Sequence, residues 1–409
     1  MRVLFIATGY LPYTFSENLV NAKLVDAMVK HGWEVDVISK KDEGPSYSIE
    51  WKEPWTYLKK SCYEINYSSH KLLKYFDYIY SGWKMGNKYM VSIRWARRAY
   101  EKAIELSSQN NYDVVITRSP NDIAHFVGYK LKNKLGIKWI ANWNDPAVPI
   151  WPYPYKHNLS SRKQKIEEKK TILIIETADI NTFPSEQLRD HFIQHFPILS
   201  NKRTEIIPHI ALLDSLFPKK ETTRSTKLRI CHSGNLSIER NPENLFKALR
   251  EIIDSGIQNL VFDIMGVATP FTEKLIKKYN LHQFVNIIGS YPYFESLEKL
   301  QEYDILLLLE ANLDNGIFFA SKIVDYVQAN RPILALSPSK GFAKDFIEKH
   351  KCGIVVDNTN YIAIKETFLK LYLQWKENKI VTRYNNRSAL AELAPSVIMN
   401  KYQQIYNSL

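Results

Sequence analysis

Residues 1–38 read MRVLFIATGYLPYTFSENLVNAKLVDAMVKHGWEVDVI, and this stretch predicts how the N-terminal half of the chain folds. Residues 3–7 are an apolar run of strand length, and residues 16–31 carry apolar side chains at helical spacing. Gly32 ends this helix, and residues 35–38 form a second apolar run. A strand, a helix and a second strand in this order predict the start of a parallel sheet covered by helices.

The same alternation continues along the chain. The expected strands are residues 3–7, 35–38, 114–117 and 139–141 in the first half, and residues 228–231, 260–265, 285–288, 305–309, 333–336 and 353–356 in the second. Stretches of helical periodicity separate most of them, and Gly136 follows one of these helices at its expected C-terminus. This order predicts an α/β protein with two Rossmann-like, doubly wound domains that face each other across a cleft.

The length of 409 residues also favours two domains. We expect one domain over residues 1–200 and a second over residues 201–382, with residues 197–226 as the region between the domains. Residues 383–409 are expected to form a helical tail that packs back on the first domain. Within the first domain, residues 47–100 form an insertion rich in aromatic and basic side chains.

Composition excludes several classes of protein. The chain is 45% hydrophobic and 24% charged, which is typical of a folded protein and not of a disordered one. Its three cysteines, Cys62, Cys231 and Cys352, are widely separated, so we expect neither a disulfide scaffold nor a clustered zinc site. The N-terminus is not expected to be a signal peptide, and no apolar run reaches the length of a membrane-spanning helix. We therefore expect a cytoplasmic protein.

The chain is basic, with 55 Lys and Arg against 43 Asp and Glu and a net charge of +12. This charge is compatible with a basic soluble surface, an anionic ligand or an anionic membrane surface. No nucleic-acid-binding motif is present, so we expect no nucleic-acid partner. Two interpretations of the insertion over residues 47–100 stay open: its rings pack on the sheet, or its rings and cations bind a membrane interface.

Ligands of open α/β sheets bind outside the carboxyl ends of the strands, so the loops that follow the strands hold the candidate site residues. Gly9 follows the first strand and lets the backbone approach a ligand, although an ordinary turn explains it equally well. Asn142, Asn144 and Asp145 follow the strand at 139–141 and could bind sugar hydroxyls. Asp145 could also act as a general base, or with Pro146 it could simply start a turn.

Two loops of the second half could bind a phosphorylated ligand. After residues 228–231, Gly234 permits close backbone approach and Arg240 precedes a helix that Asn241 and Pro242 are expected to cap and start. A guanidinium in such a place suits a diphosphate.

The second of these loops precedes a helix expected to start near Ser321. Ordinary N-capping by Ser321 explains part of its sequence, but Lys322 in the first turn would attract phosphate. Asp325, one turn further along, could accept hydrogen bonds from both hydroxyls of a ribose.

These motifs, correctly ordered and spaced, resemble those of family 4-type glycosyltransferases with the GT-B fold, especially bacterial members that build surface polysaccharide. The residues that carry the resemblance are 117–120, His125, Gly128 and 139–146 in the first half, and 232–245, 321–326 and 329–335 in the second. The resemblance implies that the first domain binds the acceptor and the second binds the nucleotide sugar.

The resemblance also implies transfer of a sugar, of the hexosyltransferase type, from a nucleotide-diphosphate sugar to an acceptor hydroxyl. Transfer would retain anomeric configuration and need neither metal nor cofactor. The acceptor would be a glycan of capsule, O-antigen or exopolysaccharide. The composition of the aromatic and basic insertion suggests in addition a lipid-linked glycan as acceptor and an enzyme that is peripheral on the inner face of the cytoplasmic membrane. The expected catalytic residues are Asp145, Arg240 and Lys322. The expected donor-binding residues are Gly9, Gly234, Asn235, Arg240, Gly289, Gly316, Ala320, Ser321, Lys322 and Asp325, and the acceptor-binding residues are Tyr10, Asn142, Asn144 and Asp145.

The sequence departs from the family pattern at three places. Residues 16–18 stand near a position where many relatives have a Gly-Gly pair, and Asn235 stands where arginine is common. A pair of glutamates separated by seven residues is frequent in the donor loop, and here the two positions hold Ile317 and Asp325. Two alternatives therefore stay open: a nucleotide-sugar epimerase of similar architecture, and an inactive partner that binds nucleotide or glycan.

Overall fold

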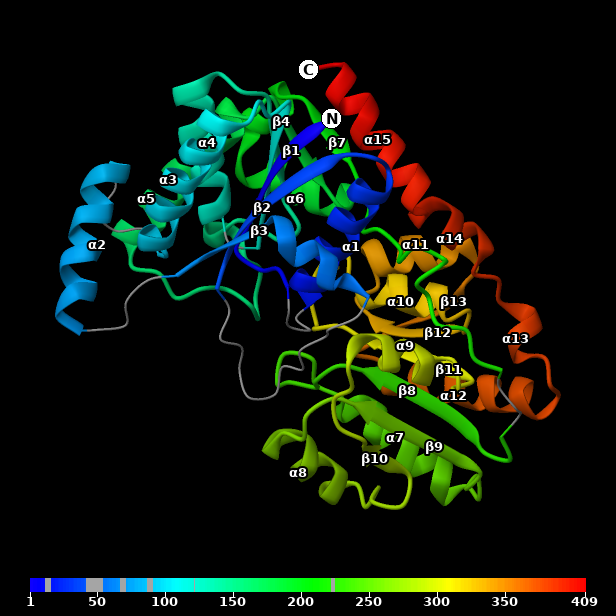
Figure 1. Ribbon diagram of the computed structural model, residues 1–409. Helices are drawn as coiled ribbons and strands as arrows, with labels where there is room; N and C mark the ends of the chain where they lie inside the picture. The colour runs from blue at the N-terminus through cyan, green and yellow to red at the C-terminus, as the bar shows by residue number, and fades with distance from the viewer. Residues whose placement is uncertain (12–15, 42–53, 67–70, 87–90, 121, 222–224) are drawn as a thin grey trace. The chain divides into compact units, whose positions relative to one another are not determined.

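The computed structural model describes residues 1–11, 16–41, 54–66, 71–86, 91–120, 122–221 and 225–409. Parts of the expected insertion, at 47–53, 67–70 and 87–90, lie outside the described residues. The chain divides into two compact units (Figure 1). Unit 1 contains described residues from 1–45, 51–208 and 395–409, and unit 2 contains those from 209–394. None of the helices in the described part of the chain is long and apolar enough to cross a membrane.

Unit 1 is built on a sheet of seven strands in the order β3-β2-β1-β4-β5-β6-β7, with every neighbouring pair parallel. The strands are β1 (Arg2–Ala7), β2 (Glu34–Lys40), β3 (Cys62–Ile65), β4 (Val114–Arg118), β5 (Trp139–Asn142), β6 (Ile180–Phe183) and β7 (Thr204–Ile206). β1 and β4 are buried along almost their whole length, as expected for central strands covered by helices on both faces.

The helices of unit 1 are α1 (Ser16–Lys30), α2 (Lys71–Met85), α3 (Ile93–Gln109), α4 (Ile123–Leu135), α5 (Ser161–Thr177), α6 (Glu186–His195) and α15 (Pro395–Asn407). Short 3₁₀ helices lie at η1 (Trp55–Ser61), η2 (Val148–Ile150) and η3 (Pro197–Asn201). α2, α3, α4 and α5 contact one another in turn, while α1 contacts α15. Gly136 ends α4 with a φ of 67°, which is the left-handed conformation that favours glycine at this position.

Unit 2 is built on a parallel sheet of six strands in the order β10-β9-β8-β11-β12-β13. The strands are β8 (Leu228–Ser233), β9 (Leu260–Met265), β10 (Val285–Ile287), β11 (Ile305–Leu309), β12 (Ile333–Ser337) and β13 (Gly353–Asp357). The helices are α7 (Glu243–Asp254), α8 (Pro270–Lys278), α9 (Tyr293–Leu300), α10 (Lys322–Gln328), α11 (Phe342–His350), α12 (Tyr361–Lys376), α13 (Ile380–Arg383) and α14 (Arg387–Leu393). α7 packs on α12, and α14 contacts α10 and α11. The predicted fold of two Rossmann-like domains is confirmed.

Two sequence predictions about these elements are wrong. Residues 197–226 are not only a connection, because η3 and β7 within this range belong to unit 1 and β7 forms the last strand of its sheet. Residues 93–100 at the C-terminal end of the expected insertion are not an insertion either, because α3 begins at Ile93 and packs on β2 and α4 as part of the layer that covers the sheet. Trp95 on this helix is completely buried.

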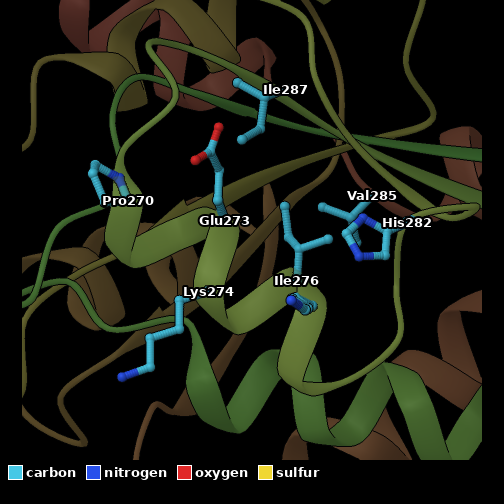
Figure 2. A pocket seen from close by; sticks show the side chains of 8 residues that line it. Pro270, Glu273, Lys274, Ile276, His282, Val285 and Ile287 are labelled. Atoms are coloured by element: carbon cyan, nitrogen blue, oxygen red, sulfur yellow. The ribbon is translucent and has the colours of Figure 1, made fainter.

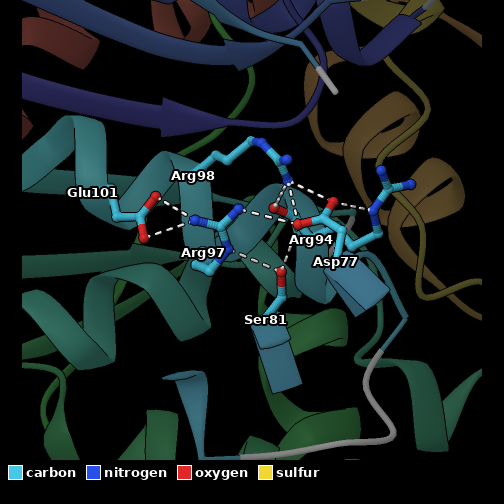
Figure 3. Close-up of polar contacts among 6 residues, drawn as sticks. All are labelled: Asp77, Ser81, Arg94, Arg97, Arg98 and Glu101. Atoms are coloured by element: carbon cyan, nitrogen blue, oxygen red, sulfur yellow. Dashed lines mark hydrogen bonds and ion pairs between the residues drawn. The ribbon is translucent and has the colours of Figure 1, made fainter. Parts of the chain in front are cut away.

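α2 is held against α3 by an ion cluster around Asp77 (Figure 3). The Asp77 carboxylate accepts hydrogen bonds from Arg94, from Arg97 at 3.1 Å and from Arg98 at 2.9 Å. Arg97 also binds the hydroxyl of Ser81 on α2 at 2.9 Å. Although burial alone would raise it, the three guanidinium groups lower the pKa of Asp77 to about 2. One α2 carboxylate therefore binds three arginines of α3.

Removal of this carboxylate is expected to loosen α2. The substitution Asp77→Ala leaves three guanidinium groups near one another, and we expect the opening of α2 to become easier by about 2 kcal/mol, between the values typical of exposed and buried pairs. Amide exchange in α2 would then accelerate about 30-fold, since 1.36 kcal/mol corresponds to a factor of ten. Because the folded pKa is lowered, this stabilisation is complete above about pH 4 and is lost as the pH falls towards 2.

The matched control for this prediction is Glu101→Ala. Glu101 pairs with Arg97 on the surface of α3, and its side chain is 49% exposed. A pair of this kind contributes at most about 1 kcal/mol, so exchange in α2 should change less than in Asp77→Ala. Equal exchange rates in the two variants and the wild type would contradict a role of the cluster in holding α2.

Candidate active site

The side chain of Tyr326 on α10 joins the carboxyl end of β8 to the middle of β11 in unit 2. Its hydroxyl accepts a hydrogen bond from the backbone N–H of Ser233 at 2.9 Å and donates one to the carbonyl of Leu307 at 3.0 Å. Tyr326 is completely buried. Because a buried tyrosine hydroxyl needs such partners, this contact fixes the first turn of α10 beside the loop that follows β8.

Gly234 and Lys322 meet at this place. Gly234 has a φ of +123°, and a Cβ at this position would lie 2.9 Å from Nζ of Lys322. The backbone conformation therefore favours glycine, and a side chain here would push the ammonium group of Lys322 away from the loop. Gly234 was predicted to let the backbone approach a ligand, and Lys322 was predicted to bind phosphate. The structure brings these two residues together although they lie about 90 residues apart in the sequence.

A Gly234→Ala substitution tests this contact. The added methyl group would displace the Lys322 ammonium and strain the backbone, so we expect affinity for a nucleoside diphosphate to fall at least about tenfold, through strain of 1–3 kcal/mol. The control is Gly256→Ala, because Gly256 also has a positive φ of 96° but a Cβ there meets no atom within 4 Å. If both variants bind the nucleotide alike, the contact with Lys322 plays no part in binding.

Three charged side chains influence one another at this edge of unit 2. Burial is the main cause that lowers the pKa of Lys322 to about 7, and the positive charge of Arg240 lowers it further. Burial likewise raises the pKa of Glu310 to about 7, opposed by Arg240 and Lys322. Arg240, which is exposed, and Lys322 are therefore near enough for their charges to repel. An anionic ligand would relieve this repulsion.

Glu310 is a site residue that the sequence analysis missed. It directly follows β11 and is 8% exposed, and within the described part of the chain its Oε2 atom has no hydrogen-bond partner. Glu310 also lines a cavity of about 200 Å³ together with residues of the loops that surround α7. A charged residue placed immediately after the apolar run Ile305–Leu309 was the signal that could have identified it.

Asp325 lies on α10 one turn after Lys322, as predicted. Its Oδ1 atom accepts a hydrogen bond from the hydroxyl of Tyr293 at 2.7 Å, and this carboxylate together with burial raises the pKa of Tyr293 well above its ordinary value. Since a carboxylate can accept several hydrogen bonds, a ribose at Asp325 stays a prediction. Tyr293, the first residue of α9, is a second contact that sequence reasoning missed.

The expected N-cap at Ser321 is wrong. Ser321 has helical dihedral angles (φ −56°, ψ −27°), and its side chain makes no capping hydrogen bond. An N-cap residue needs an extended backbone to direct its oxygen at the free N–H groups, which explains the difference. At α7 the N-cap residue is Pro242 and not Asn241, although the Oδ1 atom of Asn241 accepts a hydrogen bond from the N–H of Glu243, the first residue of the helix.

The remaining predicted donor residues have different surroundings. Oδ1 of Asn235 accepts a hydrogen bond from the N–H of Val267 at 2.8 Å and so ties the loop after β8 to the loop after β9. Gly316 lies near Glu310, since a Cβ on it would be 3.7 Å from Oε2 of that residue. The carbonyl of Ala320 accepts a hydrogen bond from Ile323 as the chain enters α10. Gly289 follows the edge strand β10, which β9 separates from β8.

The predicted acceptor residues of unit 1 form a connected group of hydrogen bonds. Asn144 donates to Oε1 of Glu17 at 2.9 Å and accepts from Arg118 at 2.8 Å. Asn142 donates to the hydroxyl of Thr182. Burial raises the pKa of Glu17 to about 7; Arg118 opposes this shift, and the charge of Asp145 adds to it. Asn144 and Asp145 are therefore brought together with Glu17 and Arg118, whose roles sequence reasoning missed.

In the described part of the chain, Gly9 and Tyr10 contact residues other than Asn144 and Asp145. The carbonyl of Gly9 accepts a hydrogen bond from Asn21 at 2.8 Å, and a Cβ on Gly9 would meet Oδ1 of Asn18 at 2.4 Å. Tyr10 is 1% exposed, and its pKa is raised by burial and by nearby Cys62, Asp26 and Tyr57. The Tyr10 hydroxyl therefore lies near residues of α1, η1 and β3. Pro12 and Tyr13 of the same loop lie outside the described residues.

A larger pocket of unit 2 involves none of the predicted site residues. It has a volume of about 580 Å³ and lies between α8 and the edge strand β10, with Ile276, Val285 and Ile287 at its apolar wall (Figure 2). Glu273, Lys274 and His282 supply its polar lining. Among the described residues, no three His, Cys, Asp or Glu side chains gather as ligands for a metal ion.

Two family models match successive parts of the chain. The model described as Glycosyltransferase Family 4 matches residues 19–210, and the model described as Glycosyl transferases group 1 matches residues 215–388. Together they span nearly the whole chain. The chain belongs to the family 4-type glycosyltransferases. No curated protein matches the sequence.

Solved structures share the fold over at least 90% of this chain. Sucrose-phosphate synthase from Thermosynechococcus elongatus has a TM-score of 0.70 at 15% identity, and the match covers 100% of this chain and 99% of that chain. HepE from Anabaena, solved in complex with UDP and glucose, has a TM-score of 0.68 at 13% identity, with 100% of both chains covered. UDP-GlcNAc 2-epimerase from Methanocaldococcus jannaschii has a TM-score of 0.53 at 13% identity, with 90% and 92% covered. The fold is therefore GT-B.

Proposed function

We propose that the protein transfers a sugar from a nucleotide-diphosphate sugar to a hydroxyl group of a glycan or lipid-linked glycan, in the assembly of a polysaccharide or glycolipid. The observation that carries this proposal is the place of the Lys322 ammonium, against Gly234 and within electrostatic reach of Arg240. Two cations beside a glycine loop at the carboxyl edge of a Rossmann-like sheet suit a pyrophosphate. The UDP bound to the HepE structure is consistent with a nucleotide donor.

In the proposed reaction, the bond between the sugar carbon C1 and the β-phosphate oxygen breaks, and a bond between C1 and the acceptor oxygen forms. The leaving nucleoside diphosphate gains negative charge, which Arg240 and Lys322 stabilise without a metal ion. Asp325 accepts hydrogen bonds from the ribose, and Glu310 from hydroxyls of the transferred sugar. On unit 1, Asn144 and Asp145 are proposed to bind the acceptor, and Asp145 is the proposed base that receives its proton. Transfer is proposed to retain the anomeric configuration, which requires that the acceptor oxygen approach C1 from the same face that the diphosphate leaves.

The composition of the segment around α2 supports a lipid-linked acceptor and a peripheral location on the inner face of the cytoplasmic membrane. Rings and cations interleave there in a way that is typical of membrane interfaces. A hexose is the proposed transferred group.

The experiment that tests the function has two steps. A thermal-shift screen of UDP, GDP, ADP and CMP first identifies the base, because a ligand that binds only the folded state raises the melting temperature. Sugar nucleotides of that base are then incubated with and without lipid-linked acceptors, in the presence and absence of EDTA, and the products are analysed by mass spectrometry. Acceptor-dependent release of the nucleoside diphosphate that persists in EDTA supports the proposal.

Two results would contradict it. An isomerised sugar nucleotide formed without acceptor would indicate an epimerase, the activity named for several proteins of similar fold. Nucleotide binding with no turnover on any acceptor would indicate a binding protein. Loss of transfer in EDTA that Mg²⁺ or Mn²⁺ restores would overturn metal independence while leaving the transferase assignment intact.

A further inference from the structure

One helix of unit 1 exposes an unusual number of large apolar side chains. Six of the fifteen exposed large hydrophobic residues in the described part of the chain lie on α2, and we call them the α2 apolar face. The α2 apolar face consists of Leu73, Tyr75, Phe76, Ile79, Tyr80 and Trp83. Phe76 is 67% exposed and Trp83 is 66% exposed. Exposed apolar patches of this kind mark interaction surfaces.

The six side chains lie on one side of the helix. At about 100° per residue, they occupy a continuous arc of about 160°. The opposite side holds Asp77, Ser81, Gly82 and Met85, of which the last three are buried. The helix therefore directs its small and polar side chains at the protein and its large apolar ones at solvent, which is the reverse of an ordinary surface helix.

This orientation is fixed by specific contacts. The Asp77 carboxylate binds Arg94, Arg97 and Arg98 of α3, and Ser81 binds Arg97 (Figure 3). Rotation of α2 to bury its apolar side would break all of these contacts. The α2 apolar face is therefore held towards the outside of unit 1.

The segment that contains this face is basic. Residues 65–100 contain seven Lys or Arg and a single acidic residue, Asp77, which gives this segment half of the net charge of +12. Asp77 is itself engaged with three arginines on the opposite side of α2, whereas Lys84 is exposed at the edge of the α2 apolar face. The ammonium of Lys84 lies 5.3 Å from the ring centroid of Trp83. Cations that flank aromatic rings match the phosphates and the acyl boundary of an anionic bilayer.

We propose that the α2 apolar face docks the protein on an anionic lipid bilayer, with α2 lying in the plane of the interface. With 15 residues, α2 is about 22 Å long, which is too short to span a bilayer. The tyrosine and tryptophan rings enter the headgroup region, and Lys84 at the edge of the face contacts lipid phosphates. The inference deepens the function proposed above and rests on it for the lipid-linked acceptor, which docking would bring within reach.

The experiment measures sedimentation of the full chain with sucrose-loaded vesicles. One set contains phosphatidylcholine and phosphatidylglycerol at 3:1, and the other contains phosphatidylcholine alone. The test variant is Phe76→Ser with Trp83→Ser. The matched control is Ile362→Ser with Leu373→Ser, which removes two exposed apolar side chains from α12 of unit 2. All four side chains are more than half exposed, so neither variant is expected to lose its fold.

We expect the wild type and the control variant to bind anionic vesicles alike, and the test variant to bind at least about tenfold more weakly, because each buried aromatic ring removes 150–250 Å² of surface from water. Binding should weaken in pure phosphatidylcholine and at high salt. Equal binding of the two variants, or no binding of the wild type, would overturn the proposal. So would a wild-type dimer that the test variant converts to a monomer, since the face would then contact a second copy.

Nucleoside diphosphate binding, measured in the same preparations, separates this proposal from the proposed function. The test variant should bind the nucleotide as the wild type does, because Phe76 and Trp83 belong to unit 1 and the candidate phosphate-binding residues to unit 2. Vesicle binding without any nucleotide binding would contradict the transferase and leave the docking surface supported. Nucleotide binding and sugar transfer without vesicle binding would support the transferase and contradict the docking surface.

Discussion

Alanine in place of Lys322 is expected to lower kcat/KM for sugar transfer on the order of 100-fold while the fold is preserved, and Arg240→Ala is expected to act in the same direction. The leaving nucleoside diphosphate develops negative charge in the transition state, and a fixed cation at that point contributes several kcal/mol to catalysis. Lys322 lies against Gly234 at the carboxyl edge of the sheet, where the diphosphate is proposed to bind. Steady-state kinetics with the identified donor and acceptor measure the effect.

Lys274→Ala is the matched control, because Lys274 is an exposed lysine of the same unit that lines the pocket beside α8 (Figure 2). Its kinetics should equal those of the wild type. Far-UV circular dichroism and the melting temperature show whether each variant keeps its fold. Unchanged kcat/KM in both Lys322→Ala and Arg240→Ala would remove these residues from the mechanism.

Affinity for the nucleoside diphosphate is expected to fall about 50-fold between pH 7 and pH 9. Burial and Arg240 lower the pKa of Lys322 to about 7 in the free protein, so its ammonium loses its proton across this range. The anion binds the protonated form, and binding near and above pH 7 therefore takes up a proton. Titration calorimetry in buffers with different ionisation enthalpies measures both the affinity and the proton uptake.

Glu310 titrates in the same range and must be separated from Lys322. Its pKa is raised to about 7, so a rising pH adds negative charge to the site and also weakens anion binding. Glu310→Gln should keep a fall in affinity with pH, and Lys322→Met should abolish most of it. Constant wild-type affinity from pH 7 to 9, or proton uptake that Lys322→Met leaves unchanged, would contradict this account.

The central strands could be predicted from the sequence because each is a short apolar run between helical stretches. Ile305–Leu309 illustrates this, since five consecutive aliphatic residues bounded by polar ones form β11. The edge strand β7 could not be predicted in this way. Its residues Thr204–Ile206 are only partly buried or exposed, so they carry no hydrophobic pattern, and their strand conformation comes from pairing with β6.

The sequence also could not predict which aromatic side chains are buried and which are exposed. Trp95 and Trp83 occur in similar basic and aromatic surroundings, yet one is completely buried against the sheet and the other is 66% exposed. The amino-acid composition around a tryptophan does not indicate whether its ring is buried or exposed. The difference arises from the contacts of Asp77 with three arginines, which form only once α2 and α3 are packed together.

In the candidate site, the sequence indicated which loops carry the chemistry but not which side chains interact. Lys322 and Gly234 were both predicted from their positions after strands, whereas their close approach depends on Tyr326, which joins α10 to β8 and β11. Glu310 and Glu17 were missed as site residues because a carboxylate becomes unusual only through its burial, which raises the pKa of each to about 7. Burial of a single polar residue leaves no periodic signal in a sequence.

The most direct test of the diphosphate site compares the Kd of the selected nucleoside diphosphate with that of its monophosphate, for the wild type and for Arg240→Ala combined with Lys322→Ala. We expect the wild type to bind the diphosphate at least about tenfold more tightly than the monophosphate, since two charge-assisted contacts reach the additional phosphate. The double variant should bind both nucleotides equally weakly. A double variant that keeps the wild-type preference for the diphosphate would contradict the assignment of Arg240 and Lys322 to the pyrophosphate.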